Sequence, residues 1–183
     1  IDEERVVVAG DEDWFEFGER RVQTLHTEGH ARHHYVLHDP QSRGVFTGDS
    51  FGISYREFDT ARGEFIYPTT TPVHFDQAEA HKSIERILSC APERLYLTHY
   101  SQVTDVGRLA NDLHRRIDDF VAIAEAHAGS EERTARMHEA MYAYLIDALR
   151  EHGCSHRAEA LRALLRMDVE LNVMGLEFWL DHR

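Results

Sequence analysis

Three short segments of the chain each follow an apolar run and end on a side chain that binds transition metals. They are Gly29–His34 (GHARHH), Phe46–Asp49 (FTGD) and Leu97–His99 (LTH). Neutral imidazole suits zinc, iron or manganese, and one carboxylate can bridge two cations because it has two oxygens. A catalytic zinc usually takes three protein ligands, and a two-metal site takes more. The segments therefore predict part of a metal site, with His30, Asp49 and His99 as its candidate ligands.

Small residues stand directly before all three candidates. Gly29 and Gly48 precede the first two, and a glycine lets the backbone turn sharply and approach a buried ion without a Cβ in the way. Thr98 precedes the third, and its hydroxyl could hold an imidazole or a carboxylate in place. We expect these three residues to shape the site without binding the metal themselves.

The elements expected around these segments combine strands with a helix. Apolar and alternating runs predict strands at residues 5–9, 14–17, 21–25, 35–38, 45–47, 65–67 and 95–97. The turn-forming residues 39–44 predict a hairpin between two of these strands. Asp76 is expected to cap a helix that ends at residues 91–92, directly before the last strand. A helix followed at once by a strand is typical of α/β proteins.

From Thr104 onward the pattern changes, and apolar residues recur three and four positions apart. This spacing predicts helices only. A first helix covers residues 106–123, and a second is expected to stop at Gly153. Ser155 and Asp168 are interpreted as the caps of two further helices.

Composition narrows the classes of function. The chain has 183 residues and a formal net charge of -13, which argues against a nucleic-acid surface because phosphate binding needs clustered Lys and Arg. The two cysteines, Cys90 and Cys154, are far apart, which favours a reducing, cytoplasmic location over a disulfide framework. No run of 18 apolar residues occurs, so no membrane span is expected. The partner expected is a small-molecule substrate.

The ordered motifs, with a hairpin between the first and the second, resemble those of the metallo-β-lactamase fold. More narrowly, they are similar to the glyoxalase-II-like and lactonase-like metallohydrolases. The first motif of that family reads Thr-Pro-Gly-His-x-x-Gly-His, where this chain has residues 27–34 (TEGHARHH). Glu28 stands in place of the usual proline and His33 in place of a glycine. Neither position is a ligand in the family, so the differences concern the local turn.

The resemblance implies both a fold and a site. Residues 1–103 would be the second half of a metallo-β-lactamase αββα sandwich, and residues 104–183 an all-helical C-terminal extension. Of two divalent metal ions, zinc with iron or manganese as alternatives, the first would be bound by His30 and the second by His99. Asp49 would bridge both metals and take part in catalysis, while His34 falls where the family keeps a supporting histidine. The implied reaction is hydrolysis of a small ester, thioester or lactone by a metal-activated water.

The leading motif of the family, His-x-His-x-Asp-His, does not occur in this sequence. In the family it supplies the other ligands and lies earlier in the chain. We therefore expect residues 1–183 to be the C-terminal portion of a longer protein, with part of the site upstream of Ile1, and the fragment alone to be inactive. Two alternatives stay open: a non-haem iron oxidoreductase similar to persulfide dioxygenases, and a metal-free helical interaction module on a degenerate sandwich.

Other chemically active residues receive weaker assignments. Residues in or near the loop after Asp49, and one beside His99, could contact a substrate: Tyr55, Arg56, Tyr67 and Tyr100. Most of the remaining histidines are interpreted as structural or surface residues, among them His33, His38, His74, His81 and His114.

The helical extension has two interpretations. Its apolar stripes most often form a core, so we expect the helices to pack on the sandwich and partly cover the mouth of the site. It could also form a homodimer, with a surface of Met137, Met141 and Trp179 adapting to the partner.

Overall fold

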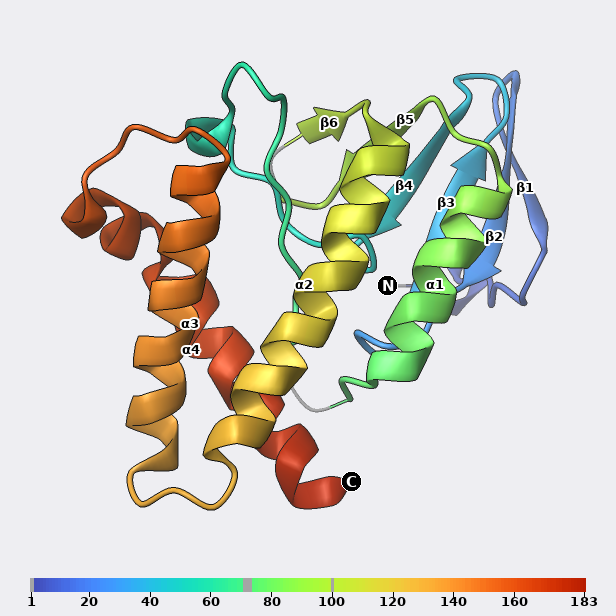
Figure 1. Cartoon of the computed structure of the whole chain (residues 1–183). Coiled ribbons are helices and arrows are strands. Elements are labelled where there is room, and N and C mark those ends of the chain that lie inside the picture. The colour runs from blue at the N-terminus through green and yellow to red at the C-terminus, as the bar shows by residue number, and fades with distance from the viewer. Residues whose placement is uncertain (1, 71–73, 100) are drawn as a thin grey trace.

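A single mixed sheet organises the molecule, and its helices lie over one face and beside it (Figure 1). The computed structural model describes residues 2–70, 74–99 and 101–183. The sheet has six strands in the order of the sequence, namely β1 (Trp14–Phe17), β2 (Arg20–His26), β3 (Tyr35–Asp39), β4 (Gly44–Gly48), β5 (Arg94–Leu97) and β6 (Ser101–Val103). All neighbouring strands are antiparallel except β4 and β5, which are parallel.

Five of the seven predicted strands are confirmed, and so is the hairpin between β3 and β4. Asp39 begins the hairpin turn: its carboxylate accepts hydrogen bonds from the backbone N–H groups of Gln41 and Ser42 at 3.0 and 3.4 Å. Arg20 also binds this buried carboxylate, at 2.6 Å. The side chain thus fixes the turn, as expected of Asp at such a position.

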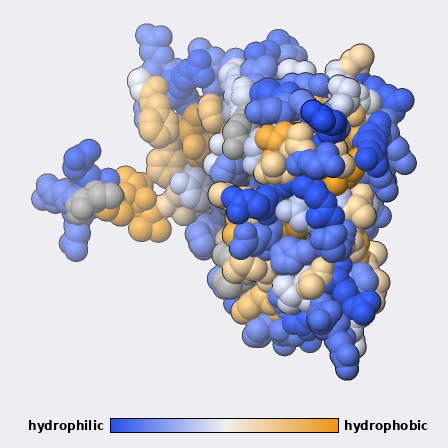
Figure 2. All heavy atoms as spheres, turned by 90° about the vertical axis from the view of Figure 1, so that its left-hand side faces the viewer, coloured by the Kyte–Doolittle hydropathy of each residue, from blue (hydrophilic) through white to orange (hydrophobic). Residues whose placement is uncertain are grey.

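The strand predicted at residues 5–9 is wrong. A short 3-10 helix, η1 (Glu3–Arg5), is followed by extended chain in which Val6, Val7 and Val8 are 56%, 71% and 89% exposed. Figure 2 shows an arm that stands out from the body of the molecule, with an apolar stretch and a hydrophilic outer end. Branched residues favour a strand only when a neighbouring strand pairs with them, and none of the described strands does so here.

The strand predicted at residues 65–67 is also wrong, although the segment is fully buried. It makes a single bridge, between Tyr67 and Ile53, within the long connection from β4 to α1 (Gln77–Ser89). This connection also holds the 3-10 helix η2 (Arg56–Phe58). Its aromatic side chains reach the core from a loop, so the apolar run reports burial and not a strand.

The predicted helices are present, with one difference in their number. Asp76 caps α1, accepting the backbone N–H of Glu79 at 2.9 Å. The helices that follow are α2 (Val106–His127), α3 (Arg133–Glu151) and α4 (Ala158–His182). Ser155 and Asp168 were expected to cap separate helices, and this is wrong: α4 is continuous, with Arg157 at its N-cap. One buried face runs along it without a break, formed by Leu161, Leu165, Val169, Val173 and Leu176.

The helices cover only one face of the sheet. Core residues of β3, β4 and β5 pack beneath α1 and α2 there, while α3 and α4 pack against α2 (Figure 1). The opposite face carries a row of paired residues across three strands: Leu37 pairs with Phe46, and Phe46 with Tyr96. Phe46 is 45% exposed and its ring stacks on that of Tyr96, with centroids 4.6 Å apart. The sheet therefore has one covered face and one partly exposed apolar face.

The helical extension packs as a core. Met137 and Met141 are fully buried, so they cannot form the partner surface that the sequence predicted for them. Trp179 is partly buried and lies against Phe75. The apolar core continues from the sheet into all four helices, and the division expected at residue 103 stays a prediction.

The structure bears on two of the expectations drawn from composition. Cys90 and Cys154 are both free thiols. Among the described residues, no helix is long and apolar enough to cross a membrane.

Candidate metal centre

The topology of the sheet brings the three candidate ligands to one edge. β4 and β5 are parallel, and β2 and β4 both run antiparallel to β3. The carboxyl ends of β2, β4 and β5 therefore lie at the same edge, where His30, Asp49 and His99 follow them in turn. Sites of open α/β sheets form outside such strand ends. The structure thus gathers side chains that are 69 positions apart in sequence, from residue 30 to residue 99.

The Asp49 carboxylate lies between the two imidazoles. Its Oδ2 is 3.5 Å from Nε2 of His30, and its Oδ1 is 3.3 Å from Nε2 of His99. Two ligands bound to one tetrahedral zinc at about 2.0–2.1 Å lie about 3.3 Å apart. The distance from each imidazole Nε2 to its carboxylate oxygen is therefore close to that between two ligand atoms on one zinc. A carboxylate that bridges two metals requires this spacing at both of its oxygens.

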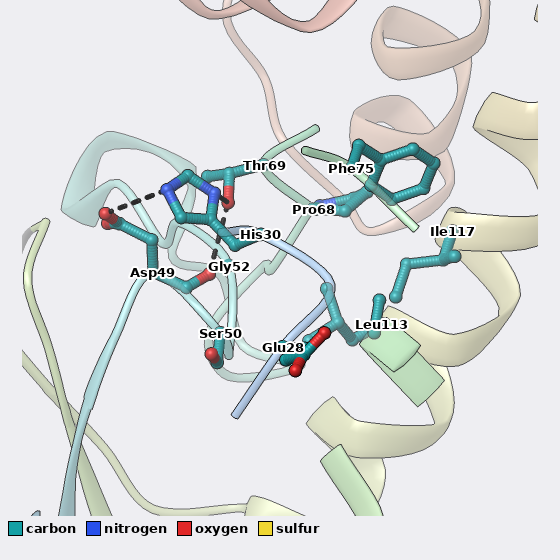
Figure 3. Close-up of a pocket in the computed structure, with 11 residues that line it drawn as sticks. Glu28, His30, Asp49, Ser50, Gly52, Pro68, Thr69, Phe75, Leu113 and Ile117 are labelled. Atoms are coloured by element: carbon teal, nitrogen blue, oxygen red, sulfur yellow. Dashed lines mark hydrogen bonds and ion pairs between the residues drawn. The ribbon is translucent and has the colours of Figure 1, made fainter. Parts of the chain in front are cut away.

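The hydrogen bonds around His30 fix its tautomer, so that Nε2 faces Asp49 with a lone pair and no proton. The Thr69 hydroxyl donates to the Asp49 carbonyl at 3.1 Å, so it accepts from Nδ1 of His30, also at 3.1 Å (Figure 3). Burial lowers the pKa of His30 and keeps the ring neutral near pH 7, against the attraction of Asp49. Nε2 then has no proton, and two acceptors face each other across 3.5 Å. A cation between them would satisfy both.

A buried oxygen of Asp49 gives the same indication. Oδ1 is shielded from solvent and, within the part of the chain that the structure describes, accepts no hydrogen bond. Buried carboxylate oxygens are costly unless a donor or a metal satisfies them. The donor set of two imidazoles and one carboxylate therefore fits divalent metals such as zinc.

His34 holds the backbone of Asp49 in place. The Asp49 N–H donates to Nε2 of His34 at 3.1 Å, so the ring proton is on Nδ1, which lies 2.9 Å from the hydroxyls of Thr27 and Ser50. Burial lowers the pKa of His34, which preserves the neutral ring that this bond needs. With both nitrogens engaged, His34 has no lone pair for a metal, as expected of a supporting histidine.

Gly29 and Gly48 are required at their positions for a different reason from the one that the sequence suggested. A Cβ on Gly29 would lie 2.3 Å from the backbone nitrogen of Ala80 in α1, and one on Gly48 would lie 2.3 Å from Nε2 of His34. Both have positive φ, +103° and +51°. Each makes room for a neighbouring part of the protein and not for an ion. Thr98 is exposed, and its expected supporting role stays a prediction.

A cavity of about 340 Å³ opens beside the three candidates. One wall comes from the connection after β4, with Ile53, Tyr55 and Thr69; the other comes from α4, with Met167, Asp168, Leu171 and Asn172. The sequence did not predict that these α4 residues line the site. Their signal was two polar residues four positions apart, Asp168 and Asn172, inside an otherwise apolar helical stripe.

Asp168 is the unusual residue of the helix wall. It is buried, its Oδ2 accepts the Tyr55 hydroxyl at 2.8 Å, and burial raises the pKa of its carboxyl. Tyr55 lines the cavity, as a substrate contact should, whereas Tyr67 is fully buried and cannot meet a substrate. Arg56 pairs with Asp59 at 3.2 Å and does not line the cavity.

Within the residues that the structure describes, the three candidate ligands do not complete a metal site. Among the described residues, no group of three or more His, Cys, Asp or Glu side chains could hold a metal ion by itself. His30 and His99 each face only one oxygen of the shared carboxylate, so each prospective metal has two ligands here. Tyr100, beside His99, lies outside the described residues.

Comparison with known sequences identifies the class of protein that this fold and this edge define. The profile of the metallo-β-lactamase superfamily matches residues 1–99, so the chain belongs to that superfamily. Members typically bind divalent metals, usually zinc, and are mostly hydrolases. The metallo-β-lactamase fold-containing protein ST1585 of Sulfurisphaera tokodaii is 31% identical over 100 residues, which are 54% of this chain and 34% of that protein.

Solved structures agree in fold. The crystal structure of ST1585 matches with a TM-score of 0.58 and 21% identity over 96% of this chain. A metallo-β-lactamase family protein from Thermus thermophilus, TTHA1429, matches with a TM-score of 0.60 and 14% identity over 94%, and a β-lactamase domain protein from Burkholderia ambifaria with 0.55 and 20% over 91%. The chain spans 53%, 48% and 48% of these structures, about half of each.

Proposed function

We propose that this chain carries one half of a two-metal hydrolase site that acts on a small ester, thioester or lactone. The observation that supports this most is the Asp49 carboxylate between two imidazoles, with one oxygen facing each. Superfamily membership supports metal-dependent hydrolysis in general. The other ligands would come from residues outside 1–183, so this chain alone should bind metal weakly and turn over little substrate.

The residues of this chain would divide the work at the metals. His30 and His99 would each hold one metal, and Asp49 would hold both and set their spacing. When bound, two divalent cations supply a hydroxide at neutral pH and an electrophile for the carbonyl oxygen. Thr69 fixes the ring of His30, and His34 fixes the backbone of Asp49, so the ligands keep their positions during turnover.

The cavity beside the metals would receive the substrate. Its volume of about 340 Å³ suits a small molecule. Ile53, Met167 and Leu171 offer it an apolar surface, while Tyr55 and Asp168 offer hydrogen-bonding groups. We infer that a substrate places its acyl or ring carbons against α4 and its carbonyl toward Asp49.

The test is a comparison of Asp49→Ala with the wild type in the longer protein, by metal analysis and by hydrolysis of a panel of esters, thioesters and lactones. Loss of the bridging carboxylate should reduce metal content and lower kcat/KM by at least about a hundredfold, since both metals lose a ligand. His138→Gln changes a partly exposed histidine on α3 that lies outside the site; it is the matched control and should behave as the wild type.

Full metal occupancy and normal turnover in Asp49→Ala would overturn the assignment of the ligand. Iron in place of zinc, together with oxygen consumption and no hydrolysis, would replace hydrolase by oxidoreductase.

A further inference from the structure

A second group of metal-binding side chains lies between α1 and α2, on helices that carry none of the three candidate ligands. The rings of His81 of α1 and His114 of α2 meet edge to edge, with centroids 4.9 Å apart and planes at 15° to each other. Their Nδ1 atoms are only 2.6 Å apart. The sequence pattern favoured structural or surface roles for both histidines, and their contact is seen only in the tertiary structure.

Each of these histidines is held by a carboxylate of the opposite helix. Nε2 of His81 lies 2.9 Å from Asp118, and Nε2 of His114 lies 3.0 Å from Glu85. On both helices an acid follows the histidine by four residues, and the helices run antiparallel side by side (Figure 1). Each acid therefore pairs with the histidine of the other helix and not with the histidine of its own helix.

The protons of this cluster can be assigned from its hydrogen bonds. An ionised carboxylate only accepts, so the nitrogen facing it must be the one that carries hydrogen. That places the protons on Nε2 of both rings and leaves both Nδ1 atoms with lone pairs, facing each other at 2.6 Å. Two lone pairs at this distance repel unless a cation lies between them.

Charge favours a divalent cation over a single proton. Asp118 and Glu85 carry two negative charges, so one shared proton leaves the cluster at -1, whereas one divalent cation leaves it neutral. An imidazole that donates its other N–H to a carboxylate is also the usual form of a metal-binding histidine. We propose that Nδ1 of His81 and Nδ1 of His114 bind one divalent transition metal of the zinc class.

Water completes the coordination of this metal. The side chains of His81 and His114 are 28% and 23% exposed, so solvent reaches the rings. Within the described residues no third His, Cys, Asp or Glu ligand joins them. Two ligand atoms on one zinc lie about 3.3 Å apart, so the two Nδ1 atoms would move apart from 2.6 Å on binding, by rotation of the partly exposed side chains. The metal would join α1 to α2 and stabilise the folded chain increasingly as its free concentration exceeds its Kd.

The test is a zinc titration by calorimetry, performed on the 183-residue chain in an Asp49→Ala background so that the edge of the sheet does not contribute. One equivalent of zinc should bind, and it should be lost in His81→Gln and in His114→Gln. Asp118→Asn should bind about 10–100-fold more weakly, because it loses the charge that orients the His81 ring. His138→Gln is the control and should bind as the background does.

Two further measurements separate this site from a shared proton. With copper as the probe, electron paramagnetic resonance should show coupling to two imidazole nitrogens, which His114→Gln reduces to one. Zinc should also raise the thermal midpoint of the background chain but not that of His81→Gln. Circular dichroism checks that each variant is folded. The same zinc stoichiometry and affinity with and without the two histidines would overturn the proposal, as would no binding to the background chain, which would leave only a shared proton.

Discussion

At the scale of single residues, Asp49 is held from its backbone and left open at its carboxylate. Its N–H donates to His34, and its carbonyl accepts the Thr69 hydroxyl. These bonds fix where the side chain begins without using either carboxylate oxygen. A bridging ligand needs this arrangement, because a carboxylate already satisfied by protein donors has less to offer a metal.

A substitution at Gly48 would test how closely His34 packs against the backbone that carries Asp49. In Gly48→Ala the new Cβ would meet the His34 ring at 2.3 Å, and the backbone has φ +51°. We expect a loss of about 3 kcal/mol or more, from strain and overpacking together. Urea unfolding measures the loss.

Gly18→Ala is the matched control for this change. Gly18 has φ +60°, and a Cβ there would meet nothing within 4 Å. Only backbone strain remains, so the cost should be about 1 kcal/mol. Equal costs at the two positions would show that the contact with His34 is unimportant.

At the scale of elements, the sheet and α4 make different contributions to the site. Three strand ends supply the candidate ligands, and the helix supplies a wall of the cavity with Asp168 and Asn172. Asn172 is tied to the connection after β4, accepting the backbone N–H of Thr70 at 2.6 Å. The C-terminal helix is thus bonded to the segment that carries Thr69, which explains how an extension can take part in the site.

The partly exposed face of the sheet leads to a prediction about a further layer. In an αββα sandwich a second sheet covers this face, and Phe46 would then be buried. Phe46→Ser should cost about 1–2 kcal/mol in residues 1–183, where a half-exposed ring loses its stacking on Tyr96 and its partial burial. In a form of the protein that includes such a second sheet, the cost should rise to about 3–5 kcal/mol. Denaturant unfolding of both forms measures the difference.

Val45 provides the comparison for this experiment. It neighbours Phe46 on β4 but is fully buried on the face beneath the helices. Val45→Ala should therefore cost the same in both forms. If Phe46→Ser also costs the same in both, no second sheet covers that face.

At the scale of the whole molecule, histidines that are fully or partly buried link stability to pH. Burial lowers the pKa of His30 and His34, and also of His38 and His152, from the ordinary value of 6.5. The unfolded chain takes up protons near pH 6.5, where the folded chain resists them. The stability that these neutral rings contribute is therefore complete above this pH and is lost as the pH falls below it.

We expect the urea midpoint to fall between pH 7.5 and pH 6, with a smaller fall in His34→Gln. The raised pKa of Asp168 acts in the opposite direction, because its carboxyl protonates more readily in the folded chain. A midpoint that rises over this range would contradict the prediction.

The helical extension has an exposed apolar surface, which is relevant to oligomerisation. Met167, Leu171 and Met174 of α4 are 65%, 40% and 53% exposed, in contrast to the buried Met137 and Met141. Two of these exposed residues line the cavity. A homodimer through the extension stays a prediction, and if it forms, this face of α4 would take part and not the one that the sequence suggested.

The sequence alone predicted those features of the fold that depend on residues close together along the chain. The hairpin at Asp39, the cap at Asp76 and most strands depend on neighbouring residues, so the pattern alone predicted them. The three candidate ligands were also visible, because each ends an apolar run.

Only the tertiary structure decided what lies far apart in sequence. Asp168 looked like a helix cap because a polar residue interrupts an apolar stripe, and packing against Tyr55 turned it into part of a cavity wall. His81 and His114 looked ordinary because their contact depends on how two helices cross. Side chains identify what can bind, but their meeting depends on non-local packing, which periodicity along one chain does not contain.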